Sequence, residues 1–94
     1  MKQEELEGYG ILVTGGGTGI GKACAVSLAQ SGALVTICGR TEAKLEKAVD
    51  DITSMVSDGG RIQYTTCDVT NEDDVARTIA EAAEFGDGLD GVVA

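Results

Sequence analysis

The feature that most constrains the fold is a glycine-rich stretch, ILVTGGGTGIGKA at residues 11–23, which begins with a short apolar run. Its glycines are Gly15, Gly16, Gly17, Gly19 and Gly21. A generic turn needs one or two glycines, and each further one costs about 0.5–1 kcal/mol relative to alanine. An anion-binding turn explains the excess, because a pyrophosphate reaches the unpaired N–H groups of a helix start only where no β-carbon intervenes. The stretch therefore predicts a phosphate-binding turn between a strand and a helix.

Apolar periodicity predicts that strands and helices alternate along the rest of the chain. Short apolar or β-branched runs predict strands at residues 10–14, 34–38, 61–67 and 89–94. Helical spacing predicts helices over residues 19–31, from Thr41 up to Gly59 and Gly60, and from Thr70 up to the break at residues 86–88. The predicted buried faces are Ile20, Ala23, Cys24, Ser27 and Leu28 on the first helix, Leu45, Ala48, Val49, Ile52 and Met55 on the second, and Val75, Ile79, Ala82 and Ala83 on the third.

Two helix ends carry recognisable signals. Gly32 stands where the first helix would end, so we expect a left-handed cap there. Thr70 is a plausible N-cap of the third helix, because Asp73 follows it in the capping-box position.

This alternation predicts an α/β fold in which right-handed crossovers build a doubly wound parallel sheet of the Rossmann type, with helices on both faces in three αβα layers. A chain of 94 residues forms one domain at most. Ligands of such sheets bind at the carboxyl ends of the strands, where the strand order reverses. The glycine-rich stretch follows the first strand and opens the first helix, so it occupies the expected place for a phosphate.

Composition excludes several classes of partner. Seven basic against sixteen acidic residues give a net charge of −9, which disfavours nucleic acid. The first eight residues are polar and acidic, unlike a signal peptide, and no apolar run approaches the roughly 18 residues of a membrane span. We therefore expect a cytoplasmic protein without a membrane partner. Cys24, Cys38 and Cys67 are far apart in apolar segments, so we interpret them as buried reduced thiols rather than metal ligands.

A P-loop is the first alternative for the glycine-rich stretch. Residues 16–22 read G-x-x-x-x-G-K, but Ala23 stands where that motif needs a hydroxyl for Mg²⁺. Asp68, at the end of an apolar strand, is the candidate second metal-binding carboxylate of such an enzyme. Magnesium-dependent nucleotide binding would identify this alternative. Lys22 is otherwise interpreted as a solvated helix residue, and the acidic side chains Glu42, Glu46, Asp50 and Asp51 as solvated surface.

The spacing T-G-x-x-x-G-x-G, formed by Thr14, Gly15, Gly19 and Gly21, resembles the cofactor loop of the short-chain dehydrogenase/reductase family. The sequence CDVT at residues 67–70 looks like the adenine-binding segment of that family. The closing LDGVVA at residues 89–94 is similar to its fourth strand. These three motifs occur in the family's order and cover essentially the whole chain.

The resemblance implies a dinucleotide cofactor and a set of residues that bind it. Asp68 would accept a hydrogen bond from the adenine amino group, and Val69 would offer its backbone. The glycine loop would contribute Gly15, Gly17, Thr18, Gly19, Ile20 and Gly21.

The end of the second strand bears on which dinucleotide is bound. A carboxylate there binds the ribose 2′-OH of NAD, whereas an arginine accommodates the 2′-phosphate of NADP. Here the strand ends in ICGRT, with Gly39 at the usual place of the aspartate and Arg40 and Thr41 after it. Thr18 stands where many NADP-preferring relatives carry a second basic residue. We expect NADP(H) rather than NAD(H), with Arg40 as the main phosphate ligand and Thr41 assisting it.

The catalytic residues of the resembled family are not expected in this chain. The family uses a Tyr-x-x-x-Lys pair, whereas Tyr9 and Tyr64 are followed four residues later by Val13 and Asp68. Residues 1–94 are therefore expected to be the N-terminal part of a single NAD(P)-binding Rossmann domain, inactive alone and without a second domain or metal. The resemblance implies a homo-oligomeric parent that transfers hydride between the nicotinamide and a carbonyl or alcohol substrate. A noncatalytic nucleotide-binding or sensor module is the second alternative.

Overall fold

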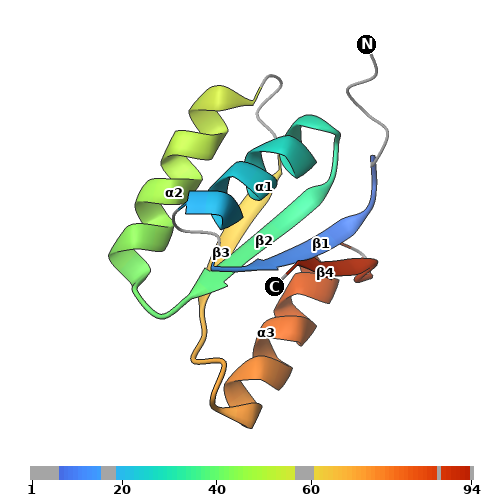
Figure 1. Cartoon of the computed structure of the whole chain (residues 1–94). Helices are drawn as coiled ribbons and strands as arrows, with labels where there is room; N and C mark the ends of the chain where they lie inside the picture. Colours follow the sequence, from blue (N-terminus) through green and yellow to red (C-terminus); the bar gives the residue numbers. More distant parts are fainter. Residues whose placement is uncertain (1–6, 16–18, 57–60, 87, 94) are drawn as a thin grey trace.

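The computed structural model describes residues 7–15, 19–56, 61–86 and 88–93 of the chain. Strands and helices alternate along it, as the sequence predicts (Figure 1). The elements are β1 (Gly10–Thr14), α1 (Gly19–Gln30), β2 (Leu34–Gly39), α2 (Glu42–Met55), β3 (Ile62–Thr66), α3 (Glu72–Phe85) and β4 (Gly91–Val93). The segment with Gly59 and Gly60, predicted to end α2, lies outside the described residues.

The four strands form one parallel sheet in the order β3-β2-β1-β4. Helices α1 and α2 lie on one face of this sheet and α3 lies on the other, which gives three layers (Figure 1). The predicted doubly wound α/β fold is therefore confirmed. The chain moves outward from β1 through β2 to β3 and then returns to place β4 on the far side of β1. The strand order thus reverses beside β1, where such sheets bind ligands.

Alternating side chains divide the core between the two faces of the sheet. The face under α1 and α2 is apolar and continuous. Its buried members are Ile11, Val13, Ala25, Ala29, Ala33, Val35, Ile37, Leu45, Ala48, Ile52 and Val56. The face toward α3 has a smaller buried cluster, formed by Leu12, Cys38, Cys67 and Ala82. Polar residues, among them Thr36 and Thr65, are also buried there.

The predicted buried face of α1 is mostly wrong, although Leu28 is half-buried and packs against the core. Ala25 and Ala29 are the buried residues of this helix, whereas Ile20 is 84% exposed and Ala23 and Ser27 are also exposed. Nearly every residue of α1 is small or apolar, so the apolar spacing carries little information about which side faces the sheet. Close packing decides instead, because alanine lets the helix approach the strands.

The other two helices follow their predicted faces in part. Leu45, Ala48 and Ile52 of α2 are buried as predicted, but Met55 at its last turn is 54% exposed. On α3, Ala82 is buried and Thr78 is buried with it, whereas Ile79 is 42% exposed. Val49, Val75 and Ala83 are half-buried. The face of the sheet that α3 covers is partly polar. Apolar spacing alone therefore does not identify the residues of α3 that contact the sheet.

The start of α3 lies one residue later than the sequence predicts. Asn71, not Thr70, is the N-cap, and its Oδ1 accepts a hydrogen bond from the amide of Asp74 at 3.1 Å. The Thr70 hydroxyl is used elsewhere, because it donates to the carboxylate of Asp68. The predicted cap at Gly32 is confirmed by its φ of +94°.

Two further expectations concern the cysteines and the membrane. All three cysteines are free thiols, and Cys38 and Cys67 are buried, but Cys24 is only half-buried. Burial, and then the neighbouring Cys67, raise the pKa of Cys38 to about 11. Within the described ranges no helix has the length and apolar character of a membrane span. The same ranges hold no cluster of side chains suited to a metal ion.

Candidate functional site

The carboxyl edge of the sheet brings three predicted segments together. Strand register places Thr14 beside Cys38, and Cys38 beside Thr65. Backbone hydrogen bonds extend this pairing beyond the strands: the Gly15 amide donates to the Cys38 carbonyl at 2.9 Å, and the Cys67 amide donates to the Gly39 carbonyl at 2.7 Å. The glycine loop, the Arg40 segment and the Asp68 segment therefore leave the sheet at one edge, side by side.

The described part of the glycine loop has the backbone that the sequence predicts. Gly15 and Gly19 have φ values of +71° and +59°, a region that residues with a side chain rarely adopt. No described atom lies within 4 Å of a Cβ placed on either residue, so the described part of the chain leaves the space beside both open. Ile20 and Gly21 lie in the first turn of α1, where the unpaired amides point outward. The predicted binding residues Gly17 and Thr18 lie outside the described residues.

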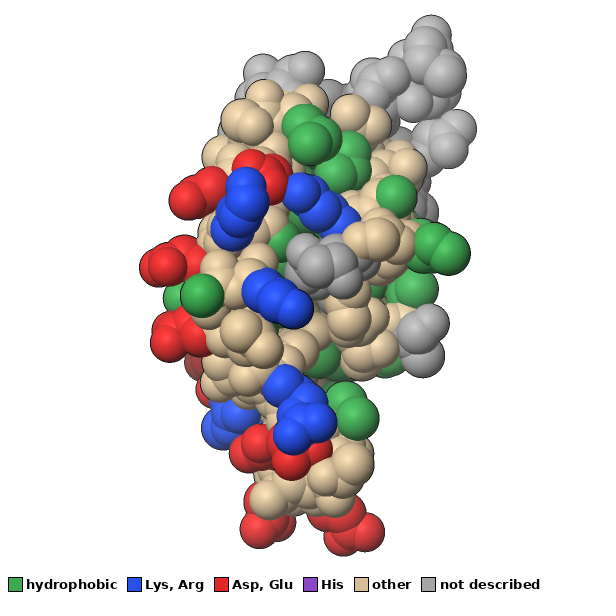
Figure 2. Space-filling model, turned by 60° about the vertical axis from the view of Figure 1, so that its left-hand side comes forward, with side chains coloured by type: hydrophobic (Ala, Val, Ile, Leu, Met, Phe, Trp, Pro, Cys, Tyr) green, Lys and Arg blue, Asp and Glu red, His purple; other side chains and the backbone are tan. Residues whose placement is uncertain are grey.

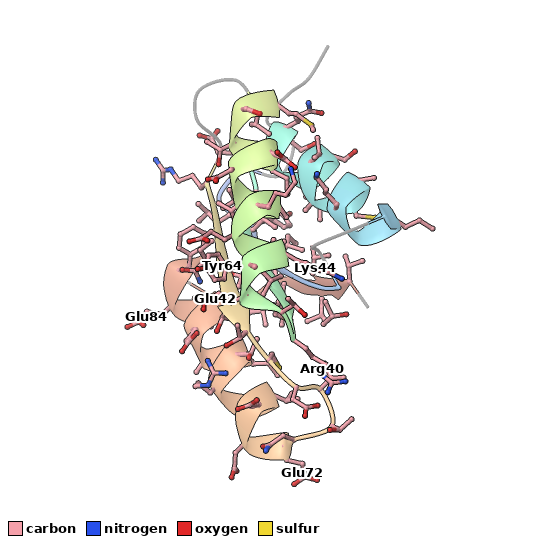
Figure 3. All side chains as sticks on the ribbon, turned by 90° about the vertical axis from the view of Figure 1, so that its left-hand side faces the viewer. Arg40, Glu42, Lys44, Tyr64, Glu72 and Glu84 are labelled. Carbon is pink, nitrogen blue, oxygen red and sulfur yellow. The ribbon has the colours of Figure 1, made fainter. Side chains whose placement is uncertain are left out.

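Arg40 and Thr41 connect β2 to α2 and are exposed. Thr41 is the N-cap of α2, yet its side chain makes no capping hydrogen bond. Figure 3 shows Arg40 on this connection, below the first turn of α2 that carries Lys44. Figure 2, which brings the left-hand side of Figure 1 forward, shows Lys and Arg side chains in a line down this face. The face in view therefore carries several basic side chains, with acidic side chains beside them, in a chain whose net charge is −9.

Asp68 lies in the turn between β3 and α3. Its Oδ1 accepts hydrogen bonds from the Thr70 amide at 2.9 Å and from the Thr70 hydroxyl at 2.6 Å, and neither bond uses Oδ2. These bonds, together with the charge of Arg40, lower the pKa of Asp68 although partial burial raises it. The carboxylate is thus an ionised hydrogen-bond acceptor within the electric field of Arg40. The adjacent Val69 is 61% exposed.

Lys22 is not the solvated residue that the sequence analysis expects. Its Nζ forms an ion pair with Asp51 at 2.7 Å, and Lys47 lies 3.5 Å from the same carboxylate. The contact joins α1 to α2 and lowers the pKa of Asp51, chiefly through the hydrogen bond from Lys22. A P-loop lysine must reach a phosphate, so this pairing disfavours the P-loop alternative.

Among the acidic residues of α2, Asp51 departs from the expected solvated surface. Glu42 is exposed as expected, and it accepts a hydrogen bond from the Tyr64 hydroxyl of β3 at 3.1 Å. Glu46 and Asp50 are exposed, as expected. Tyr64 therefore helps to hold α2 against the edge of the sheet.

Sequence reasoning missed two residues that touch the Asp68 segment. Asp74 Oδ2 accepts a hydrogen bond from the Asp68 amide at 3.1 Å, and Arg77 donates to the Thr66 carbonyl at 2.6 Å. The spacing of Arg77 and Glu81 is visible as a helical ion pair in the sequence. Contacts from a helix back to the preceding strand leave no such periodic signal.

Comparisons with known proteins agree with the fold. A family model described as short chain dehydrogenase matches residues 10–94. A 3-ketodihydrosphingosine reductase of Aspergillus fumigatus is 42% identical over 86 residues, which are 89% of this chain and 23% of that protein. A glucose 1-dehydrogenase of Gluconobacter oxydans is 42% identical over 91 residues, which are 97% of this chain and 34% of that protein.

The solved structures give the same result. A short-chain type dehydrogenase/reductase from Mycobacterium ulcerans matches with a TM-score of 0.86 and 42% identity, over 92% of this chain and 31% of that one. The chain thus spans about a quarter to a third of the length of these three proteins, at 23%, 34% and 31%.

Proposed function

The chain belongs to the short-chain dehydrogenase/reductase family, and we propose that it is the dinucleotide-binding part of an oxidoreductase that uses NADP(H). The bound nicotinamide would supply the hydride that is exchanged with a carbonyl or alcohol carbon of a small substrate. The chain's own contribution is to hold and orient the cofactor. No Tyr-x-x-x-Lys pair is present in the sequence, so no catalytic residue is assigned to it.

One observation carries this proposal: the open cradle above Gly15 and Gly19 at the carboxyl edge of the sheet. A Cβ at either position would occupy that space, so glycine keeps it available to a pyrophosphate. The first turn of α1, with Ile20 and Gly21, offers backbone amides and the positive end of the helix dipole. The residues present therefore fit the group. Gly17 and Thr18 complete the proposed pyrophosphate contacts, and Asp68 and Val69 complete the adenine contacts.

The preference for NADP(H) rests on Arg40 with Thr41. A guanidinium can hold a phosphate through two parallel hydrogen bonds, and the Thr41 hydroxyl is not engaged in capping α2. An NAD-type site would need a carboxylate after β2, where this chain has Gly39. The nearby Asp68 carboxylate would repel a 2′-phosphate, so Arg40 also offsets that charge.

Substitution of Gly19 tests the cradle. We expect Gly19→Val to abolish dinucleotide binding, because its side chain enters the open space and its φ of +59° disfavours a β-branched residue. Gly8→Val is the matched control, since Gly8 has a φ of +86° and equally open surroundings before β1. Calorimetric titration of the full-length protein with NADPH measures both. Unchanged affinity in a folded Gly19→Val protein would remove the basis of the proposal.

Substitution of Arg40 tests the cofactor preference. Arg40→Ala should weaken NADPH binding by about 1.5–3 kcal/mol, the loss of a charge-assisted contact, and leave NADH binding nearly unchanged. Arg61→Ala is the matched control. Arg61 is also exposed, but it precedes β3 and so lies at the amino ends of the strands, away from Arg40 at the carboxyl ends. Equal losses for the two cofactors, or a wild-type preference for NADH, would show that Arg40 does not bind the 2′-phosphate.

A further inference from the structure

The turn that carries Asp68 and Val69 is held from α3 by two side chains. Asp74, in the first turn of α3, accepts the amide hydrogen of Asp68 at 3.1 Å. Arg77, one turn later, donates to the carbonyl of Thr66 at 2.6 Å and to the hydroxyl of Thr65 at 2.9 Å. The backbone on both sides of Cys67 is therefore attached to the helix that follows it.

Arg77 and Asp74 also act on each other. Their charged groups lie 3.6 Å apart, and Glu81 lies 3.2 Å from Arg77 on the next turn. The hydrogen bond from Arg77 to Glu81, followed by the nearby carboxylates, raises the pKa of Arg77. Acidic side chains of α3 therefore fix the Arg77 guanidinium, which donates to the end of β3. Arg77 in turn fixes Asp74, which accepts the hydrogen bond from the Asp68 amide.

These contacts fix a different part of Asp68 from those made by Thr70. The two Thr70 bonds hold the carboxylate, whereas the Asp74 bond holds the backbone amide. Together they restrain both the main chain and the side chain of this half-buried residue. Because this residue is already restrained before binding, it loses less conformational entropy when a ligand contacts it. It also fixes the direction from which a donor must approach the carboxylate.

We propose that Asp74, supported by Arg77, is a positioning residue that makes the site select adenine over purines without a 6-amino group. This inference rests on the proposed function, in which Asp68 accepts from that amino group. Hypoxanthine presents a carbonyl oxygen at the same place, and a fixed carboxylate repels it. Thr70 holds the carboxylate within the turn, and Asp74 holds the turn to α3. A turn released from α3 would carry the carboxylate out of place and would discriminate less.

The competing explanation is that Asp74 only stabilises the start of α3. Glu72, Asp73 and Asp74 all lie in that first turn, where carboxylates interact favourably with the helix dipole. Asp73 provides the matched control, because it is an exposed acid of the same turn, whereas the bond to the Asp68 amide comes from Asp74. A dipole effect would be shared by both residues, and an effect on base selectivity would not.

The test compares NADPH with its hypoxanthine analogue by fluorescence or calorimetric titration of the full-length protein. We expect the wild type to favour NADPH by about tenfold, as for one hydrogen bond to a charged acceptor. Asp74→Ala should bring this ratio close to one, whereas Asp73→Ala should leave it unchanged. Asp74→Asn keeps a carbonyl acceptor and should restore most of the ratio.

The outcomes separate this inference from the proposed function. A wild type that binds and discriminates, with Asp74→Ala discriminating equally well, would overturn the positioning role and leave the proposed function intact. A wild type that binds neither dinucleotide would overturn both. If circular dichroism shows Asp74→Ala to be unfolded, Arg77→Lys replaces it, because Arg77 uses two separate nitrogens for Thr65 and Thr66 and lysine lacks that planar fork. An unchanged ratio in that variant would equally contradict the inference.

Discussion

The two faces of the sheet are built from different chemistry, and neighbouring residues of β2 show the contrast. Ile37 and Thr36 are both fully buried, but Ile37 packs under α1 and α2 in the apolar cluster. Thr36 lies on the α3 face, where its hydroxyl accepts from the Gln63 amide at 3.1 Å. The face under α1 and α2 gains its stability mainly from burial of apolar surface, and the face toward α3 also depends on buried directional contacts.

The difference matches what each face must do. The α1 and α2 side fixes the sheet chiefly by close packing, and its directional contacts, such as Lys22 with Asp51, lie nearer the surface. The α3 side must also place the turn after β3, so strand and helix are joined by hydrogen bonds such as those of Arg77. Hydrogen bonds specify direction, which apolar contacts do not. We infer that the apolar face carries most of the stability and that the polar face carries more of the site's geometry.

The largest expected effect on the free energy of unfolding comes from removing a large side chain on the face under α1 and α2. Ile37→Ala should lower the free energy of unfolding by about 2–5 kcal/mol, because it removes buried surface and leaves a cavity between sheet and helices. The control is Ile79→Ala on α3, where the side chain is 42% exposed and a change within about 1 kcal/mol is expected. Urea denaturation measures both. Similar losses would mean that the two faces contribute alike.

A substitution on the α3 side of the sheet should change the free energy of unfolding by less, and it should stabilise the fold. Thr78 is 2% exposed, and its hydroxyl lacks a hydrogen-bond partner among the described residues. Thr78→Val keeps the shape and removes the unpaired group, so we expect stabilisation by about 1 kcal/mol. The same change at Thr36 removes the acceptor of the Gln63 amide and should destabilise the fold by about 0.5–1.5 kcal/mol. Two changes of the same sign in urea titrations would contradict this assignment.

The sequence predicts local features of the fold well and contacts between distant elements poorly. Strand–helix alternation and the positive φ values of the loop glycines are local properties. The structure confirms the alternation, and it confirms the positive φ at Gly15 and Gly19. The ion pair of Lys22 with Asp51 joins two helices 29 residues apart, so no spacing within one element indicates it. The Asp68 turn is intermediate: the sequence motif indicates its residues, but the capping-box spacing favours Thr70 as the helix cap, whereas its hydroxyl donates to Asp68.

The first glycine of β1 and the glycine after α3 show a further limit. Gly10 and Gly86 come together in the fold, and a Cβ on Gly86 would stand 2.7 Å from the Gly10 Cα and 2.9 Å from the Gly88 carbonyl oxygen. The sequence gives Gly86 only as a helix breaker. Its second role, a close approach of two backbone segments, depends on tertiary packing that a single sequence does not display.

The smallest expected effect is a pH dependence that belongs to the polar face. The Thr65 hydroxyl, and then Arg77, lower the pKa of Glu81. A carboxyl whose pKa is lower in the folded than in the unfolded state stabilises the protein above its unfolded value of about 4.3, and this contribution is lost as the pH falls through the folded value. Thermal stability should therefore fall in acid, and Glu81→Gln should make that fall shallower.

The comparison must be made between variants, because Asp51 on the other side of the sheet has a lowered pKa as well and adds a fall of the same sign. Glu84→Gln is the matched control, since Glu84 is an exposed acid of the same helix (Figure 3). Thermal melts between about pH 3 and 7 cover the range in which carboxyl groups titrate. If Glu81→Gln and Glu84→Gln follow the same curve, the Glu81 contact does not contribute to stability, and Arg77 holds the strand end without it.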